Sequence, residues 1–134
     1  MRWPVARLQI EEDNMIYRKI EYDSIVFTDG SSTFLTIQEE ETEDAIQLEI
    51  VGELRSDIAH DLLDELIALA TVGANIRINF EKVSYITPTI QHVFLRVQQK
   101  MDSLGKGTLT LRKLPQTIYQ EFEATGTSEL LMIE

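Results

Sequence analysis

Two threonine hydroxyls flank a proline in the segment Tyr85-Ile86-Thr87-Pro88-Thr89-Ile90, between an apolar strand pattern and a helical pattern. Proline has a fixed φ and no N–H, so Pro88 suits the first position of a helix, and Thr87 then becomes the N-cap. Thr89 falls in the first turn, where the helix dipole favours an added negative charge such as a phosphoryl group. The pattern predicts a capped helix start and permits a phosphorylation switch at Thr89.

The other residue types that serve in catalysis form no recognisable site. His60 and His92 are the only histidines, and both are expected on the polar sides of helices, with nothing that compels a metal site. Acid pairs such as Asp61 with Glu65 are expected on an exposed helix face, where nothing raises a carboxyl pKa. Phosphate-binding glycine loops, zinc-protease motifs and nucleophile elbows are absent from the sequence. We therefore expect no enzymatic activity, no cofactor and no metal ion.

Charge and composition restrict the classes of partner. The chain has 134 residues, the size of one ordinary domain, and it contains no cysteine, which excludes disulfides and thiolate chemistry. Its 23 acidic and 12 basic residues give a net charge of −11, and no basic patch is visible. This balance argues against nucleic-acid binding and against docking on an anionic membrane surface. The sequence shows no membrane-spanning run and no signal peptide, so we expect a cytoplasmic protein.

Alternating strand and helix patterns must position the threonine segment. Strands are expected over residues 33–38, 45–51, 76–80, 108–111 and 130–133, and helices beginning near Ser56 (as an N-cap), Pro88 and Pro115. The third helix is expected to bury Ile118, Phe122 and also Tyr119. This order predicts an α/β fold with a mainly parallel sheet and right-handed crossovers. Functional sites in such sheets favour the carboxyl ends of strands, which is where the threonine segment lies.

The N-terminal third differs from the rest of the chain. Residues 1–14 show no sustained periodicity and are interpreted as a loosely held arm with Trp3 as an anchor, whereas residues 15–28 are rich in β-branched and aromatic types that favour strands. Residues 39–44 are strongly acidic and are expected to form a solvated turn. We therefore divide the chain into a partly β-structured extension, residues 1–32, and a domain, residues 33–134.

Three segments of the domain, in this order, resemble parts of a STAS domain, the fold of bacterial anti-sigma factor antagonists. Leu48-Glu49-Ile50-Val51-Gly52-Glu53-Leu54 is similar to the family's strand ending in G-E-L-D, residues 76–86 to its approach to the switch loop, and residues 123–131 to its L-x-x-T-G-L helix end. The resemblance covers residues 33–134. It implies a single STAS-like domain with a mixed, mostly parallel sheet and about three helices.

The resemblance also implies where a partner docks. The family's D-S-[ST]-G switch motif falls on residues 87–90, so Thr89 keeps the hydroxyl at the phosphorylated position and becomes the phospho-switch candidate. Thr87, Pro88 and Ile90 depart from the motif, and Arg55 replaces the usual acidic residue after G-E-L. The implied partner is an anti-sigma factor or a kinase-like regulator. The implied partner-binding loop consists of Tyr85, Ile86, Thr87, Pro88, Thr89 and Ile90.

The sequence leaves several functions open. The leading hypothesis is a regulatory protein–protein interaction module resembling an anti-sigma factor antagonist. A structural scaffold that is never phosphorylated is the first alternative, because the switch motif is altered. A small-ligand-sensing domain with a pocket near the loop is the second. The extension is expected to add a strand to the sheet edge or to help form a homodimer.

Overall fold

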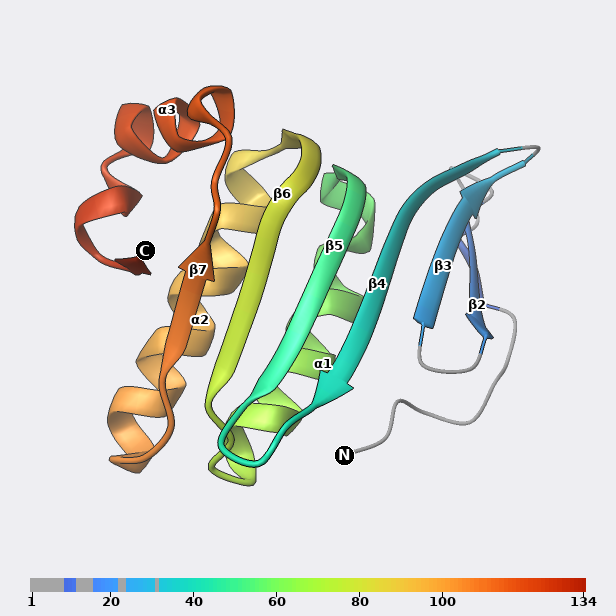
Figure 1. The fold of residues 1–134 in the computed structure, drawn as a ribbon. Coiled ribbons are helices and arrows are strands. Elements are labelled where there is room, and N and C mark those ends of the chain that lie inside the picture. The colour runs from blue at the N-terminus through green and yellow to red at the C-terminus, as the bar shows by residue number, and fades with distance from the viewer. Residues whose placement is uncertain (1–8, 12–15, 22–23, 31) are drawn as a thin grey trace.

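The computed structural model describes residues 9–11, 16–21, 24–30 and 32–134, and the expected arm with Trp3 lies mostly outside this part of the chain. Within it, eight strands form one sheet in sequence order, flanked by three helices (Figure 1). The strands are β1 (Gln9–Glu11), β2 (Ile16–Glu21), β3 (Ser24–Asp29), β4 (Thr33–Glu41), β5 (Ile46–Leu54), β6 (Ile76–Ile86), β7 (Leu109–Arg112) and β8 (Met132–Ile133). The helices are α1 (Ala59–Thr71), α2 (Pro88–Leu104) and α3 (Gln116–Thr125), with 3-10 turns at Ser56–Ile58 and Thr127–Glu129.

The sheet is parallel on one side of β5 and antiparallel on the other. Strands β5, β6, β7 and β8 run parallel and are joined by the crossover helices α1, α2 and α3, whereas β4 and β5 form an antiparallel pair. The mixed, mostly parallel sheet expected for residues 33–134 is therefore confirmed. Strands β1, β2 and β3 continue the sheet beyond β4 as antiparallel neighbours, so the extension does add to the sheet edge.

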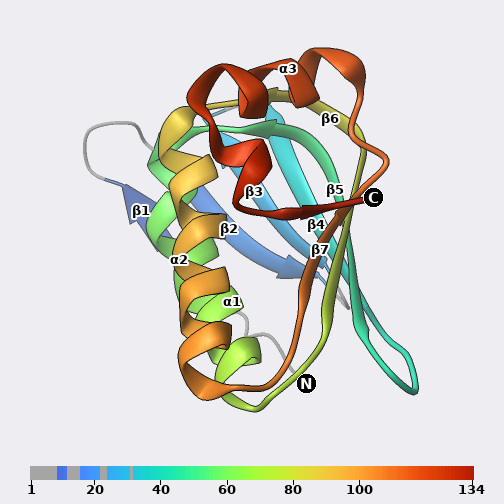
Figure 2. The same ribbon diagram turned by 90° about the vertical axis from the view of Figure 1, so that its left-hand side faces the viewer.

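Helices α1 and α2 lie side by side on one face of the sheet, and α3 lies beyond the ends of β6 and β7 (Figures 1 and 2). Alternate side chains of β5 from Ile46 to Ile50 and of β6 from Ile76 to Phe80 are buried, since successive strand residues face opposite ways. The Phe80 ring of β6 contacts Phe94 of α2 and Phe122 of α3, with ring centroids 5.6 and 6.2 Å apart. The central strand thus joins both helices in one core.

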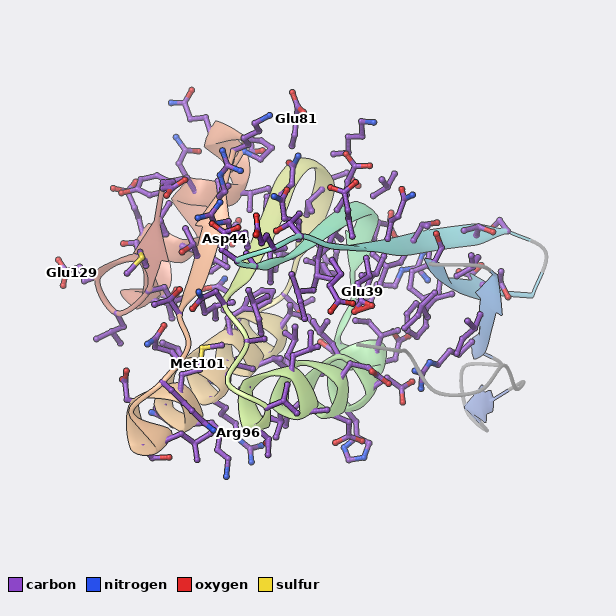
Figure 3. All side chains as sticks on the ribbon, turned by 60° about the horizontal axis from the view of Figure 1, so that its bottom comes forward. Glu39, Asp44, Glu81, Arg96, Met101 and Glu129 are labelled. Carbon is purple, nitrogen blue, oxygen red and sulfur yellow. The ribbon has the colours of Figure 1, made fainter. Side chains whose placement is uncertain are left out.

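Several element boundaries differ from the sequence prediction. Strand β6 continues to Ile86, because its second half still pairs with β5 as far as Leu54. Strand β4 includes Glu39, which the sequence assigned to a solvated turn. Glu39 pairs with Leu48 and is 9% exposed, and Figure 3 shows it on the side of the sheet that faces α1, whereas Glu81 and Arg96 extend outward. The expected inward orientation of Tyr119 is wrong, because its side chain is 36% exposed.

A buried ion pair fastens the extension to α1. Arg18 of β2 is 5% exposed, and its Nη2 donates to Glu65 Oε1 at 2.9 Å, while Nη1 lies 3.7 Å from Asp61 Oδ1. Burial raises the pKa of Glu65 above its usual range, against the opposing effect of Arg18. The prediction that the Asp61–Glu65 pair lies exposed without a raised pKa is wrong for Glu65, because the extension covers this part of α1.

No helix in the described part of the chain is long and apolar enough to cross a membrane.

Candidate functional site

The threonine segment lies where β5 and β6 end side by side. Leu54 pairs with Ile86, and the next amide, Thr87 N, donates to Leu54 O at 3.3 Å. Because β5 and β6 are parallel, this contact sets the start of α2 at the carboxyl edge of the sheet, as expected. Tyr85 and Ile86 belong to the strand end, so the connection between strand and helix is a single residue, Thr87.

Thr87 is the N-cap of α2, and Pro88 is its first residue, as the sequence predicts. The Thr87 backbone is extended, with φ −101° and ψ 159°, and its Oγ1 accepts a long hydrogen bond of 3.4 Å from Ile90 N. Its carbonyl oxygen also accepts from Gln91 N at 3.2 Å. Capping therefore satisfies first-turn amides that would otherwise have no partner.

The residues of the segment divide into a solvent-facing set and a core-facing set. Tyr85 is 50% exposed, and Pro88 and Thr89 are exposed. Ile86 and Ile90 are buried, at 4% and 0% exposure, and they belong to the main hydrophobic cluster. Within the predicted partner-binding loop, the side chains of Ile86 and Ile90 therefore face the core and support the loop from below.

Ser56 does not cap the first helix. The chain enters α1 through a 3-10 turn at Ser56–Ile58, and no side chain caps either segment. The Ser56 hydroxyl instead donates to Thr87 Oγ1 at 3.2 Å. This bond links the entry to α1 with the cap of α2, so the exposed Ser56 becomes part of the site.

A buried glutamine joins the start of α2 to the end of α3. Gln91 is fully buried, and its Oε1 accepts from Thr125 Oγ1 at 2.6 Å and from Thr127 Oγ1 at 2.8 Å. Gly126 between the two threonines has a φ of 81° and ends α3 in the left-handed conformation that favours glycine. Sequence reasoning missed Gln91, although the Thr125-Gly126-Thr127 run was a signal that this end of α3 is specialised.

Arg55 organises a second polar cluster beside Ser56. Its Nη1 lies 2.7 Å from Asp29 Oδ2, its Nε donates to Glu53 Oε1 at 2.7 Å, and its guanidinium lies 4.0 Å from the centre of the Phe34 ring. The hydrogen bond from Arg55 holds the pKa of Asp29 below its ordinary value, and the same bond raises the pKa of Arg55. The sequence showed Arg55 only as a departure from a motif.

Other features lie away from this corner. A hollow of about 440 Å³ lies at the opposite edge of the sheet, between residues 41–46 and residues 72–75. His60 and His92 are both exposed, and His60 Nε2 lies 3.3 Å from Asp64 Oδ2. Within the described ranges, no group of three or more histidine, cysteine or acidic side chains is arranged to hold a metal ion.

Comparison with known proteins identifies relatives over most of the chain. Residues 37–133 match the family described as "Mlab, STAS domain". An anti-sigma-B factor antagonist of Bacillus subtilis (strain 168) is 30% identical over 99 residues, which cover 74% of this chain and 90% of that protein. The matched family region begins within β4, so β1, β2 and β3 lie outside it.

Solved structures with low sequence identity share the fold. The anti-sigma factor antagonist SpoIIAA in its unphosphorylated form is 19% identical, with a TM-score of 0.62, and the match covers 73% of this chain and 87% of that one. The Bacillus cell fate determinant SpoIIAA in the phosphorylated form matches with a TM-score of 0.57 at 19% identity, covering 73% and 90% of the two chains. An anti-sigma factor antagonist from Mycobacterium paratuberculosis matches with a TM-score of 0.62 at 13% identity, covering 74% and 84%. From the family match and the Bacillus subtilis relative, this chain belongs to the STAS domain family.

Proposed function

We propose that this protein is a non-enzymatic regulatory module that docks on an anti-sigma factor or a kinase-like regulator. The observation that carries the proposal is the exposed, capped start of α2 at the carboxyl edge of the sheet. The docking surface consists of Tyr85, Thr87, Pro88 and Thr89, supported from below by the buried residues of the same segment. The Bacillus subtilis relative, named for its action on an anti-sigma factor, supports this class of partner.

Several hydrogen bonds hold the backbone of this corner in place, which favours specific binding. Its backbone is fixed by the Thr87 cap and by the Thr87–Leu54 hydrogen bond, and Gln91 ties the first turns of α2 to the end of α3. A surface that is ordered before binding loses little conformational entropy when a partner docks. Tyr85 adds a large, half-exposed ring of the kind that is enriched at interfaces.

Thr89 is the proposed phosphoacceptor within this surface. It is exposed and lies in the first turn of α2, where a phosphate would gain from the helix dipole. The modification would add a charge of about −1.5 to −2 to the docking surface and change its fit to a partner. SpoIIAA, which shares the fold, has been solved in phosphorylated and unphosphorylated forms, and this supports phosphorylation as part of the proposed function.

A pull-down with two matched threonine variants tests the docking site. Thr89→Tyr places a bulky ring on the proposed surface, whereas Thr71→Tyr places the same ring on an exposed position at the far end of α1. Wild-type protein and Thr71→Tyr should recover the same regulator from the native cell, and Thr89→Tyr should lose it. Equal recovery by both variants would contradict the docking site.

Mass spectrometry of the protein isolated from its native cell tests the switch separately. Phosphate on Thr89 supports the switch. A surface that binds a partner while Thr89 is never modified would instead support the scaffold alternative. The packing at this corner argues against a small-ligand site there, because Ile86, Ile90 and Leu54 are part of the hydrophobic core. The small-ligand alternative would need another site, such as the hollow at the opposite edge.

A further inference from the structure

We propose that an acidic segment of the partner protein docks along the exposed face of α2, against a basic stripe formed by His92, Arg96 and Lys100. This inference rests on the proposed function, because the stripe begins one helical turn after Thr89. It deepens that function by stating the chemistry of the partner's surface, which presents carboxylates to the stripe and an apolar side chain to the neighbouring helix α1.

The charge of the chain is divided between two regions. Residues 82–120 carry six basic residues and one acidic residue, a net charge of +5, whereas the other 95 residues carry six basic and 22 acidic residues, a net charge of −16. Helix α2 lies within the basic region, and no acidic residue occurs between Glu81 and Asp102. A short acidic segment is therefore attracted to α2, whereas a long polyanion such as nucleic acid is repelled by the rest of the molecule.

The basic stripe occupies one face of α2. Thr89, His92, Arg96 and Lys100 recur at spacings of three and four residues, so their side chains are neighbours on the helix surface. His92 and Arg96 are exposed, Lys100 is half-buried, and Figure 3 shows Arg96 extending outward. Among the described residues, none of these three basic side chains has an ion-pair partner. The stripe is thus free to pair with carboxylates of another molecule.

The stripe lies on the side of α2 that faces α1. Gln91 marks the opposite side, because its side-chain oxygen accepts hydrogen bonds from Thr125 and Thr127 at the end of α3. Lys100 follows Gln91 by nine residues, which places it half a turn around the helix from Gln91. The stripe therefore borders the surface between the two helices that lie side by side (Figure 2).

Helix α1 places an apolar side chain next to the stripe. Glu65 faces Arg18 of β2, so Leu63, about 200° away around the helix, lies on the side toward α2. Leu63 is half-buried and packs against the core, which leaves part of its surface exposed. The Ser56–Thr87 hydrogen bond holds the starts of the two helices together, and both helices follow parallel strands, so Leu63 lies level with the stripe.

This combination fits an amphipathic acidic segment. Complementary charge steers association and fixes the register of a partner, and an apolar contact beside the charges adds buried area. The stripe from His92 to Lys100 spans about 12 Å of helix, so a short helical segment of the partner covers it. The segment would extend the contact that begins at Thr89 along the next two turns of α2.

NMR titration of the isotope-labelled protein with two synthetic peptides tests the charge of the occupant. Both peptides have about 14 residues, with leucine at the positions of one helical face, and differ only in having glutamate or lysine at the polar positions. The titrations use about 50 mM salt, where exposed charges are weakly screened. The glutamate peptide should shift the amides of residues 89–100, and the lysine peptide should not.

Charge reversal on the stripe tests its role. Arg96→Glu combined with Lys100→Glu should weaken binding of the glutamate peptide by about tenfold or more, because attraction becomes repulsion. The matched control combines Arg77→Glu with Lys82→Glu, two exposed positions of β6, and changes the net charge by the same amount. Its affinity should stay within about twofold, because Arg77 alternates with buried residues and lies on the sheet face away from α2. If circular dichroism shows that the reversal variant fails to fold, Arg96→Gln with Lys100→Gln replaces it.

The same variants in a pull-down from the native cell relate the stripe to the docking site. The reversal variant should recover at most about a tenth of the regulator that wild-type protein recovers, and the control variant should recover all of it. Loss of the regulator by Thr89→Tyr but not by the reversal variant would overturn the inference and leave docking at Thr89 standing. Retention of the regulator by Thr89→Tyr would overturn the proposed function.

Three other results would overturn the inference. The first is equal binding of the two peptides, and the second is an affinity for the glutamate peptide that the charge reversal leaves unchanged. The third is self-association of the wild-type protein, measured by sedimentation velocity, that the reversal variant loses. That result would assign the stripe to the acidic residues 40–44 of a second copy of this chain.

Discussion

Breaking the buried Arg18–Glu65 pair should destabilise the protein in a way that depends on pH. Arg18→Met removes the cation but keeps much of the apolar stem, and it leaves the Glu65 carboxylate buried, at 8% exposure, beside Asp61. Removing one partner of a buried pair typically costs about 3–5 kcal/mol, because the remaining charge has no compensation. The expected result is a large loss of stability at neutral pH.

The acidity of Glu65 sets an upper limit to the part of this cost that comes from the uncompensated charge. An uncompensated carboxyl can take up a proton, and with an ordinary pKa of 4.5 this costs about 1.36 kcal/mol for each pH unit above that value. The limit is therefore about 3.4 kcal/mol at pH 7 and about 0.7 kcal/mol at pH 5. Burial already raises the pKa of Glu65 in the folded wild-type protein. The stabilising contribution of Glu65 is therefore fully present below the pKa that it has in the unfolded chain. It is lost as the pH rises through the higher pKa that it has in the folded protein.

Urea unfolding of wild-type protein and Arg18→Met at pH 5 and pH 7 measures the difference. The penalty should grow by about 2–3 kcal/mol between these pH values, from the limits above. Arg112→Met is the matched control, because Arg112 pairs with Glu134 at the surface, with side-chain exposures of 36% and 59%, and should cost less than about 1 kcal/mol at either pH. A penalty for Arg18→Met that is the same at both pH values, or as small as the control, would refute the buried-pair interpretation.

Three further perturbations probe the corner. Thr87→Ala should lower the free energy of unfolding by about 1 kcal/mol through the lost cap, whereas Thr87→Ser should restore most of it, as urea titrations can measure. Gln91→Leu should lower the free energy of unfolding by about 1–3 kcal/mol, because the Thr125 and Thr127 hydroxyls lose the buried Oε1 that accepts their hydrogen bonds. Gln91→Glu keeps an acceptor oxygen but buries a charge, so it should cost more at pH 7. Thermal unfolding at pH 7 that ranked the two variants the other way would contradict this. The stabilising contribution of Asp29 should be lost as the pH falls through its lowered pKa, and Arg55→Gln should return that pKa toward its ordinary value in a carboxyl NMR titration.

Local rules predicted the helix start correctly. A threonine N-cap and a proline at the first helical position each act within three or four residues, so the sequence contains all the information that the cap of α2 requires. The order of strands and helices was predicted for the same reason, because each element carries its own hydrophobic period. The STAS fold followed from that order together with three short segments.

Long-range pairing was not predictable in the same way. Glu65 lies on the side of α1 that the sequence read as polar, but it is buried there and accepts a hydrogen bond from Arg18, 47 residues earlier in the chain. Glu39 was assigned to a turn because its neighbours are acidic, but its pairing with Leu48 places it inside β4. In both cases a charged side chain is enclosed by a segment whose position the sequence does not specify.

The candidate site shows the same division. Thr87, Pro88 and Thr89 occupy the predicted places at the helix start, whereas the roles of Ser56, Gln91 and Arg55 depend on partners at least 26 residues away. Ser56 had the signature of a cap, but its hydroxyl is directed to Thr87 because the chain enters α1 through a 3-10 turn. The motif thus locates the candidate site, and the surrounding contacts determine which of its residues are exposed.

The most direct test of partner docking at the start of α2 is an NMR titration of the isotope-labelled protein with the captured regulator. The largest amide shift changes should map to Thr87, to residues 89–92 and to Ser56, since Pro88 has no amide N–H. Changes concentrated at residues 42–45 and 72–75, around the hollow at the opposite edge, would contradict the account.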